Sequence, residues 1–216
     1  LSFFLHHLRT VDHLPELEAS HTAMSSTWDR SGGNADGTDF KNIVNPTADS
    51  PGRNILLDTA GPGCIHRIFV GVLTEQQAGT RIQIFLDHNQ NPTFDMPILE
   101  FFHDSNGPFP YPLVFHKSYP GTLFPIPFEK YCLIQLVNER FGKPDWNDAA
   151  WSNYWQVVHT RYPDSVRVKT LTWPPGEDEK NEIAATAQAW LEAASQPPAE
   201  PAKWTIDDTT VLEPGK

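Results

Sequence analysis

The sequence predicts an all-β fold, an antiparallel jelly-roll β-sandwich with short flanking helices. Short runs rich in β-branched and aromatic residues recur over residues 43–173, and turn residues separate them. The 20 Pro and 13 Gly are spread along the chain, which suits many turns and disfavours long helices. No helical pattern stands between the runs, so we expect their strands to pair as antiparallel neighbours in two packed sheets.

Each strand is predicted from its apolar pattern and from the turn that ends it. "TRIQIFLDH" places Ile82, Ile84 and Leu86 on one face before "NQNP" breaks the pattern. The turn cluster "HDSNGPFPYP" and a loop over 140–149 separate later runs. The predicted strands are, in chain order, "NILLDTA", "CIHRIFVGVLT", "TRIQIFLDH", "PILEFF", "TLFPIPF", "YCLIQLVNE", "NYWQVVHTRYP" and "VRVKTLTW".

Helical patterns flank this region and suggest how the chain is divided. Apolar residues at three- and four-residue spacing predict a short helix over 3–18, and an Ala- and Glu-rich stretch predicts another over 176–196. The expected organisation is an N-terminal helical segment, a jelly-roll domain, a helix, and a Pro-rich linker with the opening strand of a second jelly roll. These segments cover residues 1–24, 25–175, 176–196 and 197–216.

Composition limits the classes of partner. The formal net charge of -11 disfavours binding to nucleic acid, which requires a basic surface. No apolar run approaches the roughly 18 residues of a membrane-spanning helix, so no membrane span is expected. Cys64 and Cys132 lie in apolar runs and are expected to be buried thiols, with a single bridge between them as the alternative. The compartment stays open, with a secreted or periplasmic location favoured over a cytoplasmic one.

The stretch "SSTWDRSGGNADG", residues 25–37, is the most distinctive polar segment. It combines glycines with planar hydrogen-bonding groups and one Trp, and polar loops that carry an aromatic side chain often bind ligands. The alternative is a self-contained loop in which Asp29 and Arg30 bind neighbouring backbone. The candidate binding residues are Trp28, Asp29, Arg30, Asn34 and Asp36.

Motifs for metal, cofactor or nucleophilic chemistry are absent from the sequence. The 9 His are scattered outside zinc-site spacings, so we expect no metal and no cofactor, although calcium is harder to exclude on the acidic stretch 29–39. Carboxylates remain, because glycoside hydrolysis uses two of them about 5–9 Å apart. Spacing selects no pair among the carboxylates at strand ends or loops, which are Asp29, Asp36, Asp87, Glu100, Asp104 and Glu139.

Four stretches in this order resemble one family. They are "SSTWDRSGGNADG", "AGPGCIHRIFVGV", "IQIFLDHNQNPTFDMPILEFF" and "TLFPIPFEKYCLIQLVNE", the last followed by "SNYWQVVHTRYP". The combination resembles the family called domain of unknown function 2961, now glycoside hydrolase family 172, over residues 25–162.

The resemblance implies a carbohydrate ligand and an assembly. Members of the family act on α-D-fructofuranosides, difructose anhydride and D-arabinofuranosides, and they have two tandem jelly rolls in trimers or hexamers. Their paired catalytic glutamates lie in the second jelly roll near a "GTGTEDYF"-like stretch that has no counterpart here, so the resemblance assigns no catalytic residue in this chain. It places the polar loop near the sugar, with Trp28 stacking on a ring and Asp29, Arg30, Asn34 and Asp36 bound to hydroxyls.

The sequence leaves three functions open. The first is the N-terminal half or subunit of a glycoside hydrolase acting on furanosides, with its glutamates supplied by a second jelly-roll half or a partner. The second is a structural jelly-roll protein that forms a symmetric or filamentous assembly, because jelly rolls recur in capsids. The third is a carbohydrate-binding module without catalysis.

Overall fold

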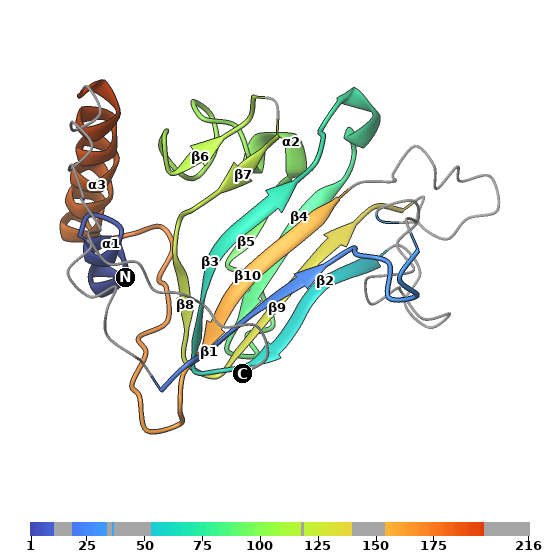
Figure 1. The fold of residues 1–216 in the computed structure, drawn as a ribbon, viewed down its shortest axis with the longest axis horizontal. Coiled ribbons are helices and arrows are strands. Elements are labelled where there is room, and N and C mark those ends of the chain that lie inside the picture. Colours follow the sequence, from blue (N-terminus) through green and yellow to red (C-terminus); the bar gives the residue numbers. More distant parts are fainter. Residues whose placement is uncertain (11–18, 34–35, 37–52, 118, 140–153, 197–216) are drawn as a thin grey trace, which may run out of the picture.

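A computed structural model describes residues 1–10, 19–33, 36, 53–117, 119–139 and 154–196 (Figure 1). The expected loop over 140–149, the residues 197–216 and part of the expected helix over 3–18 lie outside these residues. The helices are α1 (Ser2–His7), α2 (Ile98–Phe101) and α3 (Glu177–Ser195), with a 3-10 turn at Glu75–Gln77. The strands are β1 (His21–Ser26), β2 (Arg53–Ala60), β3 (Gly63–Val70), β4 (Arg81–Leu86), β5 (Phe94–Pro97), β6 (Val114–Phe115), β7 (Gly121–Thr122), β8 (Ile126–Phe128), β9 (Tyr131–Val137) and β10 (Trp155–Arg161).

The strands form two antiparallel sheets with jelly-roll connectivity. Sheet A has the order β1-β10-β3-β7-β6, with β8 also paired to β3, and sheet B has the order β2-β9-β4-β5. The chain pairs from its ends inward: β1 with β10, β2 with β9, β3 with β7 and β8, and β4 with β5. This pattern is a long hairpin wrapped into two layers, which is the jelly-roll arrangement. The predicted all-β sandwich is confirmed.

The core lies between the two sheets and follows the alternation seen in the sequence. Ile82, Ile84 and Leu86 of β4 are fully buried. Opposite them in the β4–β9 register lie Leu136, Ile134 and Cys132, which are also fully buried. Successive side chains of a strand point to opposite faces of the sheet, so the apolar residues of β4 and β9 all lie on the face that meets the core.

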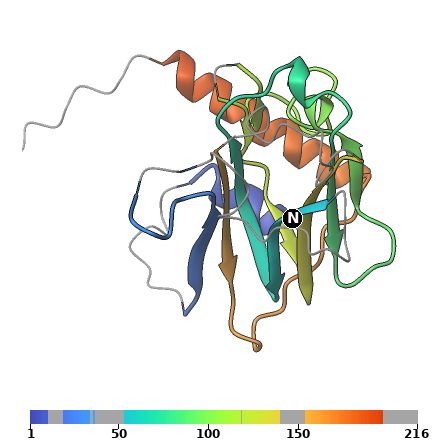
Figure 2. The ribbon, with the colours of Figure 1, turned by 90° about the vertical axis from the view of Figure 1, so that its right-hand side faces the viewer.

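The helices α1 and α3 pack on each other beside β8, as Figure 1 shows, and Figure 2 shows the same region turned by 90°. The indole of Trp190 in α3 donates a hydrogen bond of 2.7 Å to the carbonyl of Leu8, just after α1. Ile183 and Ala187 form the buried face of α3. Within the described residues, no helix is long and apolar enough to cross a membrane.

Two predicted strands are wrong. Residues 98–101 of "PILEFF" form the single helical turn α2, because Ile98 and Phe101 are both buried at a spacing of three, which fits one face of a helix. Residues 166–173 form no strand. The Leu171 amide donates to the carbonyl of Pro127 in β8, but Pro127 has no N–H to donate, so a ladder cannot continue there.

The strand β1 was not predicted. "HTAMSS" is mostly exposed at the edge of sheet A, so it lacks the apolar alternation that marks the inner strands. Its pairing with β10 is regular over its whole length, from His21 opposite Arg161 to Ser26 opposite Gln156. Neighbouring backbone, rather than intrinsic preference, determines this strand.

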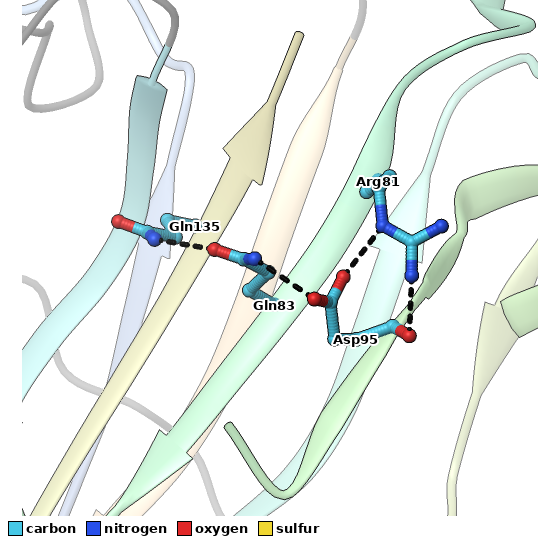
Figure 3. A network of polar contacts seen from close by, with 4 residues as sticks. All are labelled: Arg81, Gln83, Asp95 and Gln135. Carbon is cyan, nitrogen blue, oxygen red and sulfur yellow. Dashed lines mark hydrogen bonds and ion pairs between the residues drawn. The ribbon is translucent and has the colours of Figure 1, made fainter. Parts of the chain in front are cut away.

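The outer face of sheet B carries a row of polar contacts (Figure 3). Arg81 donates to the Asp95 carboxylate at 2.6 Å, Gln83 donates to the same carboxylate at 3.1 Å, and Gln135 donates to the Gln83 carbonyl oxygen at 2.7 Å. A carboxylate only accepts hydrogen bonds, so Asp95 determines which way both amides point. The row therefore ends at the Gln135 Oε1 oxygen, which is buried and has no hydrogen-bond partner among the described residues.

Both cysteines are free and buried, so the expected buried thiols are confirmed and the bridge is wrong. Burial is the main cause that raises the pKa of Cys64 and of Cys132. Both side chains are therefore protonated thiols at neutral pH, and they pack as small apolar groups.

Two histidines in the neighbouring strands β3 and β10 resist protonation. Burial lowers the pKa of His66, and the charge of His159 lowers it further. Burial also lowers the pKa of His159. A backbone hydrogen bond with Val157 raises this pKa, and the charges of His21 and Arg161 lower it. Both imidazoles are therefore neutral in the folded protein at neutral pH.

We expect the free energy of unfolding to fall as the pH drops below about 6.5, the ordinary pKa of histidine. Below that pH the unfolded chain binds protons that the folded chain does not yet bind at His66 and His159, whereas above it the contribution is constant. Each histidine changes the stability by at most about 1.4 kcal/mol per pH unit. Urea unfolding at about pH 7.5 and about pH 5.5 measures the loss of unfolding free energy, and His159→Gln should make this loss smaller. An equal loss in the variant would contradict the assignment of the pH dependence to His159.

Candidate functional site

The polar loop Thr27–Gly33 follows β1 and is anchored to the start of β10. The Thr27 amide donates to the Trp155 carbonyl at 3.2 Å, and the Trp155 amide donates to the Thr27 hydroxyl at 3.1 Å. The Ser25 hydroxyl at the end of β1 donates to the Leu56 carbonyl of β2 at 2.6 Å, which links the two sheets. The loop therefore begins on a rigid part of the sandwich.

Arg30 folds back over the beginning of the loop. Its guanidinium donates to the Trp28 carbonyl at 2.9 Å and to the Ser26 carbonyl at 3.0 Å. Its Cζ atom lies 5.1 Å from the centroid of the Trp28 ring, within the range of a cation–π contact. Trp28 is 52% exposed, whereas Trp155 below it is 1% exposed. Arg30 therefore holds an exposed indole in place.

The two described aspartates of the loop close it. The Asp29 carboxylate accepts hydrogen bonds from the Ser31 amide at 2.9 Å and the Ser31 hydroxyl at 2.6 Å. The Asp36 carboxylate accepts a hydrogen bond from the Asp29 amide. A Cβ atom on Gly33 would lie 2.7 Å from Asp29 Oδ2, and Gly32 has φ of +80°, so both positions favour glycine.

The structure brings Trp28, Asp29, Arg30 and Asp36 together in this one loop, and Asn34 lies outside the described residues. The contacts of Asp29 and Arg30 are those of a self-contained loop. The same contacts preorganise the loop, and they leave much of the Trp28 ring exposed. A carboxylate has two oxygens and about four acceptor positions, so Asp36, which accepts one hydrogen bond from the Asp29 amide, retains capacity for hydroxyl donors.

The other candidate carboxylates lie on different parts of the sandwich. Asp87, after β4, accepts hydrogen bonds from the amides of Lys130 and Tyr131 at 2.7 and 3.3 Å, so it connects β4 to β9. Glu100 lies in α2, Glu139 follows β9, and Asp104 lies after α2. Among the described residues, no three His, Cys, Asp or Glu are close enough together to hold a metal ion.

Two histidines that sequence reasoning did not single out lie beside Asp104. His116 Nδ1 is 3.0 Å from Asp104 Oδ2, and the His103 and His116 rings stack with centroids 5.0 Å apart. No spacing motif connects positions 103 and 116. The adjacent "HD" pair at 103–104, in a turn cluster, was the only local signal.

Jelly-roll sandwiches occur in lectin domains as well as in viral capsids, so carbohydrate binding is one of the roles that this architecture supports. Residues 18–180 match the family model described as the GH172 first beta-sandwich domain. The chain therefore belongs to glycoside hydrolase family 172, and the resemblance noted in the sequence is confirmed. None of the curated proteins compared matches the chain.

Proposed function

We propose that this chain is the first half of a glycoside hydrolase that acts on fructofuranosides or arabinofuranosides, and that the Thr27–Gly33 loop contacts the sugar. Two observations support the proposal. The chain belongs to glycoside hydrolase family 172, and the loop presents an exposed indole, while the Asp36 carboxylate accepts a hydrogen bond from the amide of Asp29, the residue after Trp28. The observation that carries the proposal is the fixed, half-exposed ring of Trp28.

The proposed role of the loop is to bind and orient the sugar. A sugar ring has an apolar C–H face and hydroxyls at its rim, so its face would lie against Trp28 while a hydroxyl donates to Asp36. Positioning of this kind lowers the barrier because the substrate is held in a productive orientation. Arg30 would act through Trp28, since its guanidinium is bound to loop carbonyls.

The two catalytic carboxylates are proposed to come from a second β-sandwich of the same assembly. The matched family model is by its own description the first sandwich of the family, which implies a further one. One carboxylate would protonate the leaving oxygen and the other would act as nucleophile or base. In the proposed domain organisation, the first jelly roll spans residues 25–175 and the second begins within residues 197–216. The proposed assembly is a trimer or hexamer.

We expect Trp28→Ala in the full-length protein to raise KM for a D-arabinofuranosyl oligosaccharide about tenfold, because a stacked aromatic contact contributes roughly 0.5–1.5 kcal/mol beyond its buried area. The effect should appear mainly in KM, with kcat little changed. The free energy of unfolding should change by less than about 0.5 kcal/mol, since the ring is exposed. Steady-state kinetics and urea unfolding measure the two quantities.

Tyr119→Ala is the matched control, because Tyr119 is 60% exposed and lies outside the loop. An equal KM for the Trp28→Ala variant and the unmodified protein would refute the role of the loop. If the full-length protein binds D-arabinan and fructan without releasing sugar, the hydrolase assignment fails and a binding module takes its place. If it does neither, the structural role is favoured.

A further inference from the structure

A second polar cleft lies between α2 and β6, away from the Thr27–Gly33 loop. Figure 1 places α2, β6 and β7 together at the top of the view, while the loop lies at the right. The cleft has a volume of about 420 Å³, and its lining residues are Asp104, Tyr111, Phe115, His116 and Lys117. This volume lies within the range of small-molecule sites.

His103 is held in one tautomer by the backbone. Its Nδ1 atom accepts hydrogen bonds from the Ser105 amide at 3.1 Å and from the Asn106 amide at 3.2 Å. A nitrogen that accepts carries no proton, so these two hydrogen bonds place the ring proton on Nε2. The 3.7 Å separation of His103 Nδ1 from Asp104 Oδ1 is therefore not an ion pair.

His116 has the opposite tautomer. Its Nδ1 atom is buried and lies 3.0 Å from Asp104 Oδ2, although it makes no hydrogen bond of normal geometry to any described residue. The carboxylate beside it favours a proton on Nδ1, and in that tautomer Nε2 is the hydrogen-bond acceptor. The His103 and His116 rings stack with only 5° between their planes, so each restricts the orientation of the other.

Asp104 is ionised at neutral pH. Burial acts to raise its pKa, but the Ser105 hydroxyl, which donates to Asp104 Oδ1 at 3.0 Å, and the neighbouring His116 lower the pKa below its ordinary value overall. The carboxylate is therefore a hydrogen-bond acceptor on the cleft wall, which Lys117 also lines.

The turn that carries these groups is tightly closed. The Gly107 amide donates to the His103 carbonyl at 2.9 Å, and a Cβ atom on Gly107 would lie 2.3 Å from that carbonyl oxygen and 2.7 Å from the carbonyl oxygen of Glu100. Only glycine fits this close approach, so the turn that carries His103 and Asp104 is packed tightly against the backbone of α2.

The remaining wall is aromatic. Tyr111 is 53% exposed, and Phe115 of β6 is half-buried. An open aromatic face beside a carboxylate and an imidazole acceptor suits a ligand with an apolar ring face and several hydroxyls. Within the described part of the chain, no group of three His, Cys, Asp or Glu side chains is arranged to hold a metal ion.

We propose that this cleft is a second carbohydrate-binding site, which takes one sugar unit of the polymer with its ring against Tyr111. The sugar hydroxyls donate to Asp104 and to His116 Nε2. His103 touches no sugar in this arrangement and positions His116 by stacking. The ligand class rests on the proposed function, whereas the site is independent of the Thr27–Gly33 loop.

Nuclear magnetic resonance of the full-length protein tests the site with a linear α-D-arabinofuranosyl oligosaccharide and, separately, a fructofuranosyl oligosaccharide as probes. The imidazole nitrogen signals are expected to report an Nε2–H tautomer for His103 and an Nδ1–H tautomer for His116. On titration with one of the two probes the His116 signals should shift and saturate. Unmoved His116 signals at saturating concentrations of both probes would overturn the proposal.

Variants separate this site from the loop. Tyr111→Ala and His116→Gln should each weaken binding at the cleft about tenfold, while the response of the Trp28 indole signal stays the same. Trp28→Ala should leave the His116 response unchanged, and Tyr119→Ala should change neither. A moving His116 signal with an unmoved Trp28 signal supports the cleft and refutes the loop. A His116 response that Tyr111→Ala leaves at full affinity refutes the cleft.

Discussion

Phe109→Ala is expected to lower the free energy of unfolding by about 3–5 kcal/mol, the largest effect of any variant discussed. Phe109 is 1% exposed and stacks on Phe124 with centroids 4.1 Å apart and an angle of 13°. Phe94, Phe101 and Trp173 surround it, each with its centroid 5.5 Å away. Alanine removes the central ring of this cluster, and the fixed neighbours cannot close the cavity. Urea unfolding followed by Trp fluorescence measures the loss.

Tyr119→Ala again supplies the control, since 60% of that residue is exposed and little buried area is lost. Its effect should stay below about 1 kcal/mol. A loss below about 1.5 kcal/mol for Phe109→Ala would mean that the cluster relaxes into the cavity. The packing between the sheets would then be looser than the described contacts indicate.

Gly63→Ala is expected to cost about 3 kcal/mol, although it adds only one methyl group. Gly63 begins β3, where it pairs with Phe128 of β8 on one side and with Arg161 of β10 on the other. A Cβ atom there would lie 2.5 Å from the Phe128 ring and 2.7 Å from the Thr160 carbonyl oxygen. Two hydrogen-bonded neighbours hold this strand, so relief requires movement of backbone.

Gly176→Ala is the matched control, because a Cβ atom at Gly176 would meet nothing within 4 Å. Gly176 is the N-cap of α3, where alanine is somewhat less favourable than glycine, so a loss below about 1 kcal/mol is expected. Equal losses for the two variants would indicate a general cost of replacing glycine, and the close approach at Gly63 would then carry no special weight. Chemical unfolding of both variants decides the comparison.

The strands that the sequence predicted well carry their own signal. In β4, Ile82, Ile84 and Leu86 alternate with polar residues, because one face of the strand meets the core and the other does not. The helix α3 has helix-forming residues and Pro197 after its end. These features depend on near neighbours in the chain, so the sequence alone predicts them.

The strand β1 lacks such a signal, whereas the segment 166–173 has one and forms no strand, and both were predicted wrongly for one reason. A strand exists only where a second backbone offers matching donors and acceptors. The exposed residues of β1 find them in β10, whereas the apolar run after Val166 meets Pro127 of β8, which has no N–H. The partner decides the outcome in both cases, and it is distant in the chain.

The same distinction applies to the candidate sites. Trp28, Asp29, Arg30 and Asp36 lie close together in the chain, so their composition alone marked the loop as a candidate site. Hydrogen-bond geometry, however, assigns Arg30 to the loop carbonyls and leaves the indole exposed, and no sequence pattern contains that geometry.

Composition and alternation in this chain were sufficient for the sandwich and for the polar loop as a candidate, and the resemblance of four stretches indicated the family, because each depends on residues adjacent in sequence. The pairing of strands, the inward turn of Arg30 and the meeting of His116 with Asp104 come from chain folding, since they bring together groups from separate segments. Helix and strand propensities contribute little free energy per residue. Where they conflict with contacts between distant segments, those contacts determine the structure.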